Sequence, residues 1–215
     1  MFDWLVVRDD RRDVLVEAVK RVWRGGQALV ADVDFPHKKK PRRIAFAWPA
    51  PGVGARRAPR WPELLADWHE VTGDDPLCPV DALAVAAEEV SGLGADALCV
   101  HGGPGLAHAT VIWYEKGAVE SYEHVGKSTV AWTPNKLGRP FDGSAAQTAA
   151  ALGRKLVGVD EDEVNVLERV ANMNRAVGEV LLVRAFTRIL DMDPPPIDEL
   201  AGLVATANPQ RFTVA

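Results

Sequence analysis

The stretch HATVIWYEKGAVESYEHV, residues 108–125, decides the fold class. Runs of β-branched and aromatic residues flank Lys116-Gly117, and two such runs around a short glycine-containing turn predict a β-hairpin. A third strand is expected at STVAW, residues 128–132. A hairpin continued by another strand is typical of an antiparallel sheet, or of the antiparallel part of a mixed sheet.

Upstream of the hairpin, strand-like and helix-like runs alternate. Apolar residues at helical spacing predict the helices, and short β-rich runs bounded by turn residues predict the strands. The predicted helices are residues 11–23, 61–71 and 78–92. The predicted strands are residues 2–7, 27–35 and 42–49, with a strand or a connection into one at residues 96–100. Four prolines within residues 49–62 predict an exposed loop.

Downstream of Pro140 the pattern becomes helical. Helices are predicted over residues 143–156, 160–190 and 197–207, and the segment DMDPPP separates the last two. We therefore expect the α+β class: a mixed or antiparallel sheet with packed helices, followed by a helical C-terminal part. The division is an α/β part at 1–135 and a helical part at 144–215 packed on it, or both parts form one domain.

Composition excludes several classes of protein. The 215 residues are 47% hydrophobic and 26% charged, which is typical of a globular domain with a sizeable core. The net charge of −5 argues against bulk nucleic-acid binding. The N-terminal sequence does not resemble a signal peptide, and the apolar runs are shorter than the roughly 20 residues of a membrane span. With two cysteines and no disulfide framework, we expect a cytoplasmic protein, unless it is exported without a cleaved signal.

Two glycine-rich motifs are incomplete. GKST at residues 126–129 resembles the second half of a phosphate-binding loop, but Ser121 stands where that motif needs glycine. HGGPG at residues 101–105 resembles an oxyanion loop of α/β-hydrolases, but the chain has no G-x-S-x-G nucleophile elbow. We interpret the first as a polar turn and the second as a flexible turn between two strands.

A basic stretch spans residues 37–60, with eight Lys and Arg and no acidic residue. It is compatible with RNA, DNA or an acidic partner, but a solvated hairpin loop is the favoured interpretation. The five histidines lack helical H-x-x-x-H spacing, and the two cysteines lack C-x-x-C spacing. We therefore expect neither a metal nor a cofactor.

Cys78 is the candidate nucleophile. It directly precedes the helical segment PVDALAVAAEEV, and proline is favoured at the first position of a helix. A thiol at a helix N-terminus lies near the positive end of the helix dipole, which favours the nucleophilic thiolate. The unpaired backbone amides there can also hold an oxyanion. Cys99, inside an apolar segment, is interpreted as a buried small hydrophobic residue.

His108 and Glu123 are the candidate base and orienting acid. If Lys116-Gly117 is a two-residue turn, Thr110 faces Glu123 and His108 faces Val125. His108 and Glu123 then share one face of the sheet as diagonal neighbours. A three-residue turn would instead pair His108 with His124.

Over residues 74–126 the chain resembles transglutaminase-like proteins, which belong to the wider papain-like group. The resemblance lies in a cysteine at a helix start, the step GLGADALCV into a strand, and the hairpin HATVIWYEKGAVESYE. It implies Cys78 as nucleophile, His108 as base and Glu123 as orienting acid, although the family has aspartate there and tryptophan in place of Thr110. It implies a thiol hydrolase or acyltransferase: peptide hydrolysis, glutamine deamidation or acyl transfer on a protein or peptide.

An interaction protein is the alternative. A regulator, scaffold or immunity-type partner, including a degenerate member of the same fold, needs no working cysteine. The seven tryptophans are compatible with this reading, because tryptophan is enriched at binding hot spots. The C-terminal helices offer a surface for a protein partner.

Overall fold

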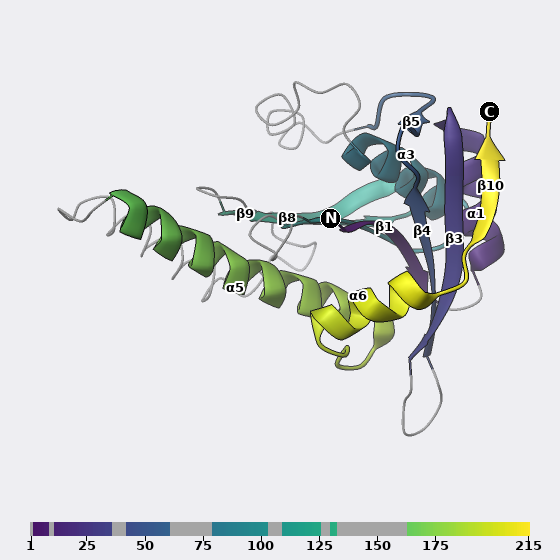
Figure 1. The fold of residues 1–215 in the computed structure, drawn as a ribbon. Coiled ribbons are helices and arrows are strands. Elements are labelled where there is room, and N and C mark those ends of the chain that lie inside the picture. The colour runs from purple at the N-terminus through teal and green to yellow at the C-terminus, as the bar shows by residue number, and fades with distance from the viewer. Residues whose placement is uncertain are drawn as a thin grey trace.

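The computed structural model describes residues 2–8, 11–35, 42–60, 79–102, 109–125, 130–132 and 163–215. Within this part of the chain, a large antiparallel sheet is combined with four helices and a two-stranded ribbon, which confirms the α+β class (Figure 1). The helices are α1 (Arg12–Val22), α3 (Pro79–Gly92), α5 (Glu163–Leu190) and α6 (Ile197–Thr206). The strands are β1 (Phe2–Arg8), β2 (Trp23–Arg24), β3 (Gly26–Phe35), β4 (Arg42–Pro49), β5 (Gly54–Ala55), β6 (Ala97–Gly102), β7 (Ala109–Glu115), β8 (Ala118–Val125), β9 (Val130–Trp132) and β10 (Gln210–Val214).

Most elements agree with the sequence patterns, and three short strands were not expected. β2 begins at Trp23, the last residue of the predicted helix 11–23. β5 forms inside the proline-containing segment 49–62, where a loop was predicted, and pairs with β2. β10 follows the last helix and pairs with β3, so the C-terminal part also adds a strand to the sheet. The helices predicted at 61–71 and 143–156 lie outside the described residues.

The eight-stranded sheet has the order β10-β3-β4-β1-β6-β7-β8-β9. All neighbouring strands are antiparallel. β1 lies inside the sheet between β4 and β6, and its residues Trp4–Val7 are buried. A strand covered on both faces reads as a continuous apolar run rather than an alternating one, which explains the sequence WLVV.

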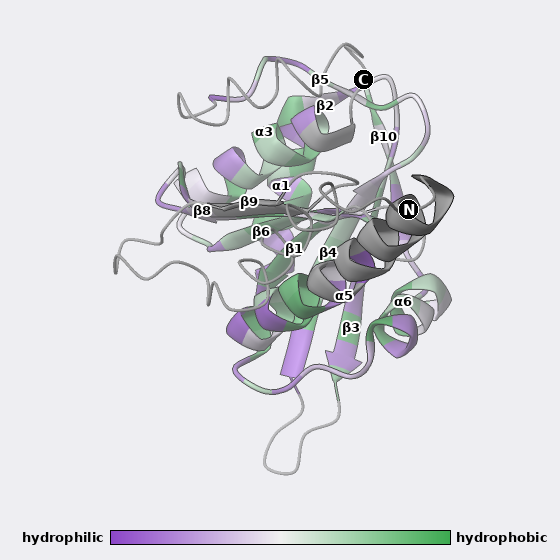
Figure 2. Cartoon of the chain, turned by 90° about the vertical axis from the view of Figure 1, so that its left-hand side faces the viewer, coloured by the Kyte–Doolittle hydropathy of each residue, from purple (hydrophilic) through white to green (hydrophobic). Residues whose placement is uncertain are grey.

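The helices cover the sheet on both faces. α1 and α3 share one apolar core with the sheet, and α5 and α6 share a second core on the opposite face. Figure 2 shows α3 and α1 on one side of the strands and α5 with α6 on the other. Buried positions run without interruption from Ala82 to Glu88 in α3, so this part of the helix is covered on nearly every side. The indole Nε1 of Trp23 donates to the Ala82 carbonyl oxygen at 2.7 Å and ties β2 to the first turns of this helix.

Aromatic packing fixes the end of α5 on the sheet. The Phe186 ring is fully buried, lies edge-on to Trp4 of β1 at a centroid distance of 6.3 Å, and stacks on Phe46 of β4 at 6.2 Å. No helix in the described part of the chain is both long and apolar enough to cross a membrane.

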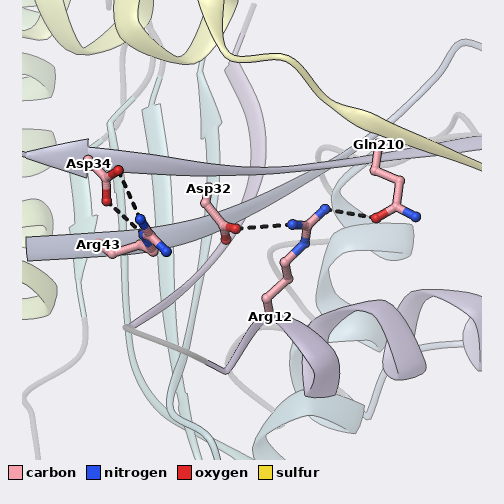
Figure 3. Close-up of polar contacts among 5 residues, drawn as sticks. All are labelled: Arg12, Asp32, Asp34, Arg43 and Gln210. Atoms are coloured by element: carbon pink, nitrogen blue, oxygen red, sulfur yellow. Dashed lines mark hydrogen bonds and ion pairs between the residues drawn. The ribbon is translucent and has the colours of Figure 1, made fainter.

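Polar contacts hold the outer strands in register (Figure 3). Arg12 in α1 bridges two strands, with one nitrogen 3.1 Å from Asp32 Oδ2 on β3 and another 2.9 Å from Gln210 Oε1 on β10. Arg43 of β4 makes two hydrogen bonds to Asp34 of β3. These bonds lower the pKa of Asp34 below its ordinary value. The C-terminal strand is thus anchored through side chains as well as through its ladder.

Candidate functional site

A contact at the C-terminal end of α3 shows in which direction the helix runs over the sheet. The Gly117 amide in the β7–β8 turn donates to Ser91 Oγ at 2.8 Å, so the end of the helix lies at the end of β7. The helix is 14 residues long and packs over β6, with β1 and β7 on either side. Its start must therefore lie toward the opposite end of the sheet, where β1 and β7 begin. Figure 1 shows the start of α3 on the same side as the N-terminus.

The dimensions of a helix and a strand indicate beside which residue of β7 the helix begins. From Ser91 back to Pro79 the helix covers about 18 Å, at about 1.5 Å per residue. The same length along β7, counted back from Gly117 at about 3.4 Å per residue, ends near Ile112. The residue before Pro79 is Cys78, and the residue before Ala109 is His108. The two segments that adjoin these candidates therefore begin at the same end of the sheet.

The predicted hairpin is confirmed, but its predicted register is wrong beyond the turn. Lys116 and Gly117 have φ values of 52° and 77°, as a two-residue turn requires, and Glu115 faces Ala118. The register then shifts by one residue between Trp113 and Tyr114. A β-bulge adds one residue to one strand and moves every later pair. The bulge therefore moves Glu123 to the other face relative to Thr110, but it pairs His124 with Thr110 and not with His108, as the three-residue turn would have done.

The bulge removes the argument that joined His108 to Glu123. Thr110 lies opposite His124, and Glu123 lies opposite Val111, whereas the regular register would have paired Thr110 with Glu123. Cys78 and His108 lie outside the described residues. Glu123 lies on β8, and only its backbone is described. The structure therefore does not test whether these three side chains meet.

An unpredicted pair of side chains lies at the same end of the sheet. Asp3 on β1 and His101 on β6 are register partners, and Asp3 Oδ1 is 2.6 Å from His101 Nδ1. His101 is buried, with 9% of its surface exposed, and Thr110 lies opposite it on β7, also buried. A buried histidine held by a carboxylate has the arrangement of a base and its orienting acid.

Strand alternation places this pair on the face covered by α3. Ala97, Cys99 and His101 are every second residue of β6, so their side chains lie on the same face of the sheet. Ala97 and Cys99 belong to the core that α3 shares. Leu5 and Val7, which share a face of β1 with Asp3, belong to the same core. The side chains of Asp3 and His101 therefore lie on the side of the sheet where α3 begins.

The interpretation of residues 101–105 as a turn is wrong for its first two residues, because His101 and Gly102 are the last residues of β6. Sequence reasoning missed His101 for this reason. The available signal was alternation, since Ala97, Cys99 and His101 lie two residues apart along one strand. Asp3 could not be matched to it, because 98 residues separate the two in the chain. Cys99 is buried, as predicted.

A cleft lies beside the first turn of α3. Its volume is about 720 Å³, which is within the ordinary range of ligand sites. Asp81 of α3 forms one wall, and segments around β2 and β5 form the others. Asp81 comes three residues after Cys78, which is nearly one helical turn. The cleft is large enough for a few residues of an extended polypeptide.

Several arginines of the basic stretch have partners within the protein. Arg43 pairs with Asp34, and Arg57 Nη1 lies 2.5 Å from Glu88 Oε2 on α3. Arg56 Nε donates to the Trp23 carbonyl oxygen at 3.1 Å. These cations contribute to the fold, which weakens the case for an open nucleic-acid surface. Lys38, Lys39 and Lys40 lie outside the described residues.

In the described part of the chain, no group of three or more His, Cys, Asp and Glu side chains is placed to hold a metal ion. The chain matches no protein-family model, no curated protein and no solved structure. The resemblance to transglutaminase-like proteins therefore rests on the sequence residues quoted above alone.

Proposed function

We propose that this protein carries out cysteine-dependent amide chemistry of the transglutaminase-like or papain-like type, with Cys78 as the nucleophile. One observation carries the proposal: α3, the helix that follows Cys78, lies over the middle of the sheet and begins at the end that carries the buried His101–Asp3 pair. A thiol directly before Pro79 adjoins the N-terminus of this helix, at the end of the sheet that also carries a histidine held by a carboxylate.

The position of Cys78 suits covalent catalysis. The helix dipole of α3 favours the thiolate, and the first backbone amides of a helix have no partner within it. Attack on an amide carbonyl would form a thioester and release an amine, and water or a second amine would then complete the reaction. Peptide hydrolysis, glutamine deamidation and acyl transfer all share this first step. The cleft beside Asp81 is the proposed place for the polypeptide around the scissile amide.

Casein provides a test with three readouts. Peptide hydrolysis gives new α-amino groups, deamidation releases ammonia, and acyl transfer incorporates monodansylcadaverine. We expect at least one product with the unaltered chain and with Cys99→Ala, and none with Cys78→Ala. Equal product from Cys78→Ala would exclude Cys78 as the nucleophile. The proposal would also fail if no product forms and Cys78 reacts with iodoacetamide no faster than free cysteine.

A non-catalytic interaction protein is the second candidate. Val180 and Val183 on α5 are 43% and 37% exposed, and a one-turn spacing brings them together on the helix surface. In this second candidate function, these valines are the contact for a protein partner. Loss of partner binding in the charged variant Val180→Asp, with unchanged binding in Cys78→Ala, would favour this function over the enzyme.

A further inference from the structure

The cleft beside the first turn of α3 combines cationic side chains with open stretches of main chain. Among the described residues that line it, three of the four charged side chains are arginines, and the fourth is Asp81 on the α3 wall. The other walls include Gly25, Gly52 and Gly54, which have no side chain to keep a ligand away from the main chain. An extended polypeptide can therefore lie close against these walls.

Two of the three arginines are bound within the protein. Arg57 Nη1 lies 2.5 Å from Oε2 of Glu88, whose side chain is buried. Arg56 donates to the carbonyl oxygens of Trp23 and Ala215. These contacts hold both guanidinium groups against the segments that surround the cleft. Arg56 and Arg57 therefore keep the cleft in shape.

Arg24 differs from these two arginines. It lies opposite Gly54 in the β2–β5 ribbon, so the two residues share a face of the ribbon. Because Gly54 has no side chain, Arg24 extends across it, with Nε 3.9 Å from the position that a Cβ atom would take. Arg24 is exposed, and within the described part of the chain its guanidinium makes no hydrogen bond or ion pair. Its five N–H donors can therefore pair with a ligand.

We propose that this cleft binds an extended polypeptide that carries an acidic side chain, with the carboxylate paired to Arg24. A planar guanidinium can hold a carboxylate through two parallel hydrogen bonds, which gives both strength and a defined orientation. Asp81 disfavours a second acidic side chain at the α3 wall. The inference rests on the proposed function only in naming this polypeptide as the substrate, because binding here requires no catalytic residue.

A nucleic acid is the competing anionic partner, and the cleft suits it less well. None of the described residues that line the cleft is aromatic, whereas single-stranded nucleic acids usually stack their bases on aromatic rings. Asp81 also places a negative charge against a phosphate backbone. The net charge of −5 acts in the same direction. These observations favour a polypeptide as the occupant.

The test is a titration with two blocked pentapeptides, in which four alanines surround a central glutamate or a central glutamine. Amide NMR shifts of Gly25, Gly52 and Gly54 report where the peptide binds, and their concentration dependence gives Kd. We expect the glutamate peptide to bind about fivefold more tightly at low salt. Arg24→Gln should make the two Kd values equal. The matched control Arg211→Gln removes an exposed arginine that does not line the cleft, and should keep the preference.

Gly54 offers a second pair of variants, which keeps the test valid if Arg24→Gln does not fold. Its φ is not positive, and an added Cβ meets no atom closer than 3.9 Å, so a side chain is tolerated there. Gly54→Asp places a carboxylate beside Arg24 within the chain and should remove the preference for the glutamate peptide. The uncharged variant Gly54→Asn should keep that preference.

Three results would overturn the inference. They are an unchanged preference in Arg24→Gln, no shift of the glycine amides at millimolar glutamate peptide, and tighter binding of a single-stranded thymidine oligonucleotide than of this peptide. In each case, casein products that are lost in Cys78→Ala would still support the proposed function. Conversely, Arg24-dependent binding without any casein product would support the binding site and contradict the enzyme.

Discussion

At the residue scale, the β7–β8 turn depends on backbone conformations that few residues adopt. Gly117 has a φ of 77°, and a Cβ atom at this position would lie 3.6 Å from Gly92 Cα at the end of α3. The turn therefore does two things: it reverses the strand and meets the helix that carries the candidate site at its other end. Lys116, at a φ of 52°, shows that a residue with a side chain is accommodated at the preceding position.

We predict that Gly117→Ala lowers the free energy of unfolding by about 1 kcal/mol, because an L side chain is strained at positive φ. Gly202 in α6 is the matched control, since nothing lies within 4 Å of an added Cβ and its backbone is helical. Gly202→Ala should raise the free energy of unfolding by about 0.5–1 kcal/mol. Urea titration measures both changes, and the same sign for the two variants would contradict this account of the turn.

The candidate site was only partly predictable at this scale. Cys78 could be proposed from its place before Pro79, because helix-start signals are local in sequence. The pairing of Thr110 with His124 could not be predicted, because no local pattern marked the bulge. A single extra residue in one strand changes which side chains share a face of the sheet. The glycines after His101 indicate a turn, whereas His101 and Gly102 are the last residues of the buried strand β6.

At the element scale, the helices on the two faces of the sheet are buried to different extents. α3 is apolar on nearly every side and packs against β6. In α5, the described side chains that join the core belong to the last turns of the helix. Helical and strand periods in the sequence were sufficient to predict both helices and most strands, because each period is a local property. β10 was missed since QRFTV is short and follows a helix, and its pairing with β3 is a long-range contact.

The docking of α5 rests on Phe186. We predict that Phe186→Ala lowers the free energy of unfolding by about 3–5 kcal/mol, because it leaves a cavity between Trp4 and Phe46. The Thr187 hydroxyl, next to it, donates to the Val183 carbonyl oxygen of the same helix, and Thr187→Ala should cost less than about 1 kcal/mol. Equal unfolding midpoints in urea for Phe186→Ala and the parent chain would contradict the docking.

At the scale of the whole molecule, the sheet brings together residues that are distant in sequence. Asp3 belongs to the first strand and His101 to the sixth, and the central helix between them in the sequence begins directly after Cys78. The α+β class and the order of elements could be read from the sequence. The strand order could not, since β1 lies between β4 and β6 and each pairing spans tens of residues.

A crystal structure of the unaltered chain gives the most direct measurement of the central claim: the distance from Cys78 Sγ to the imidazole nitrogens of His101 and His108. The account predicts about 3–4 Å from Cys78 Sγ to an imidazole nitrogen of one of these two histidines, a separation at which a proton can pass between them. A Cys78 Sγ atom far from both imidazole rings would contradict it.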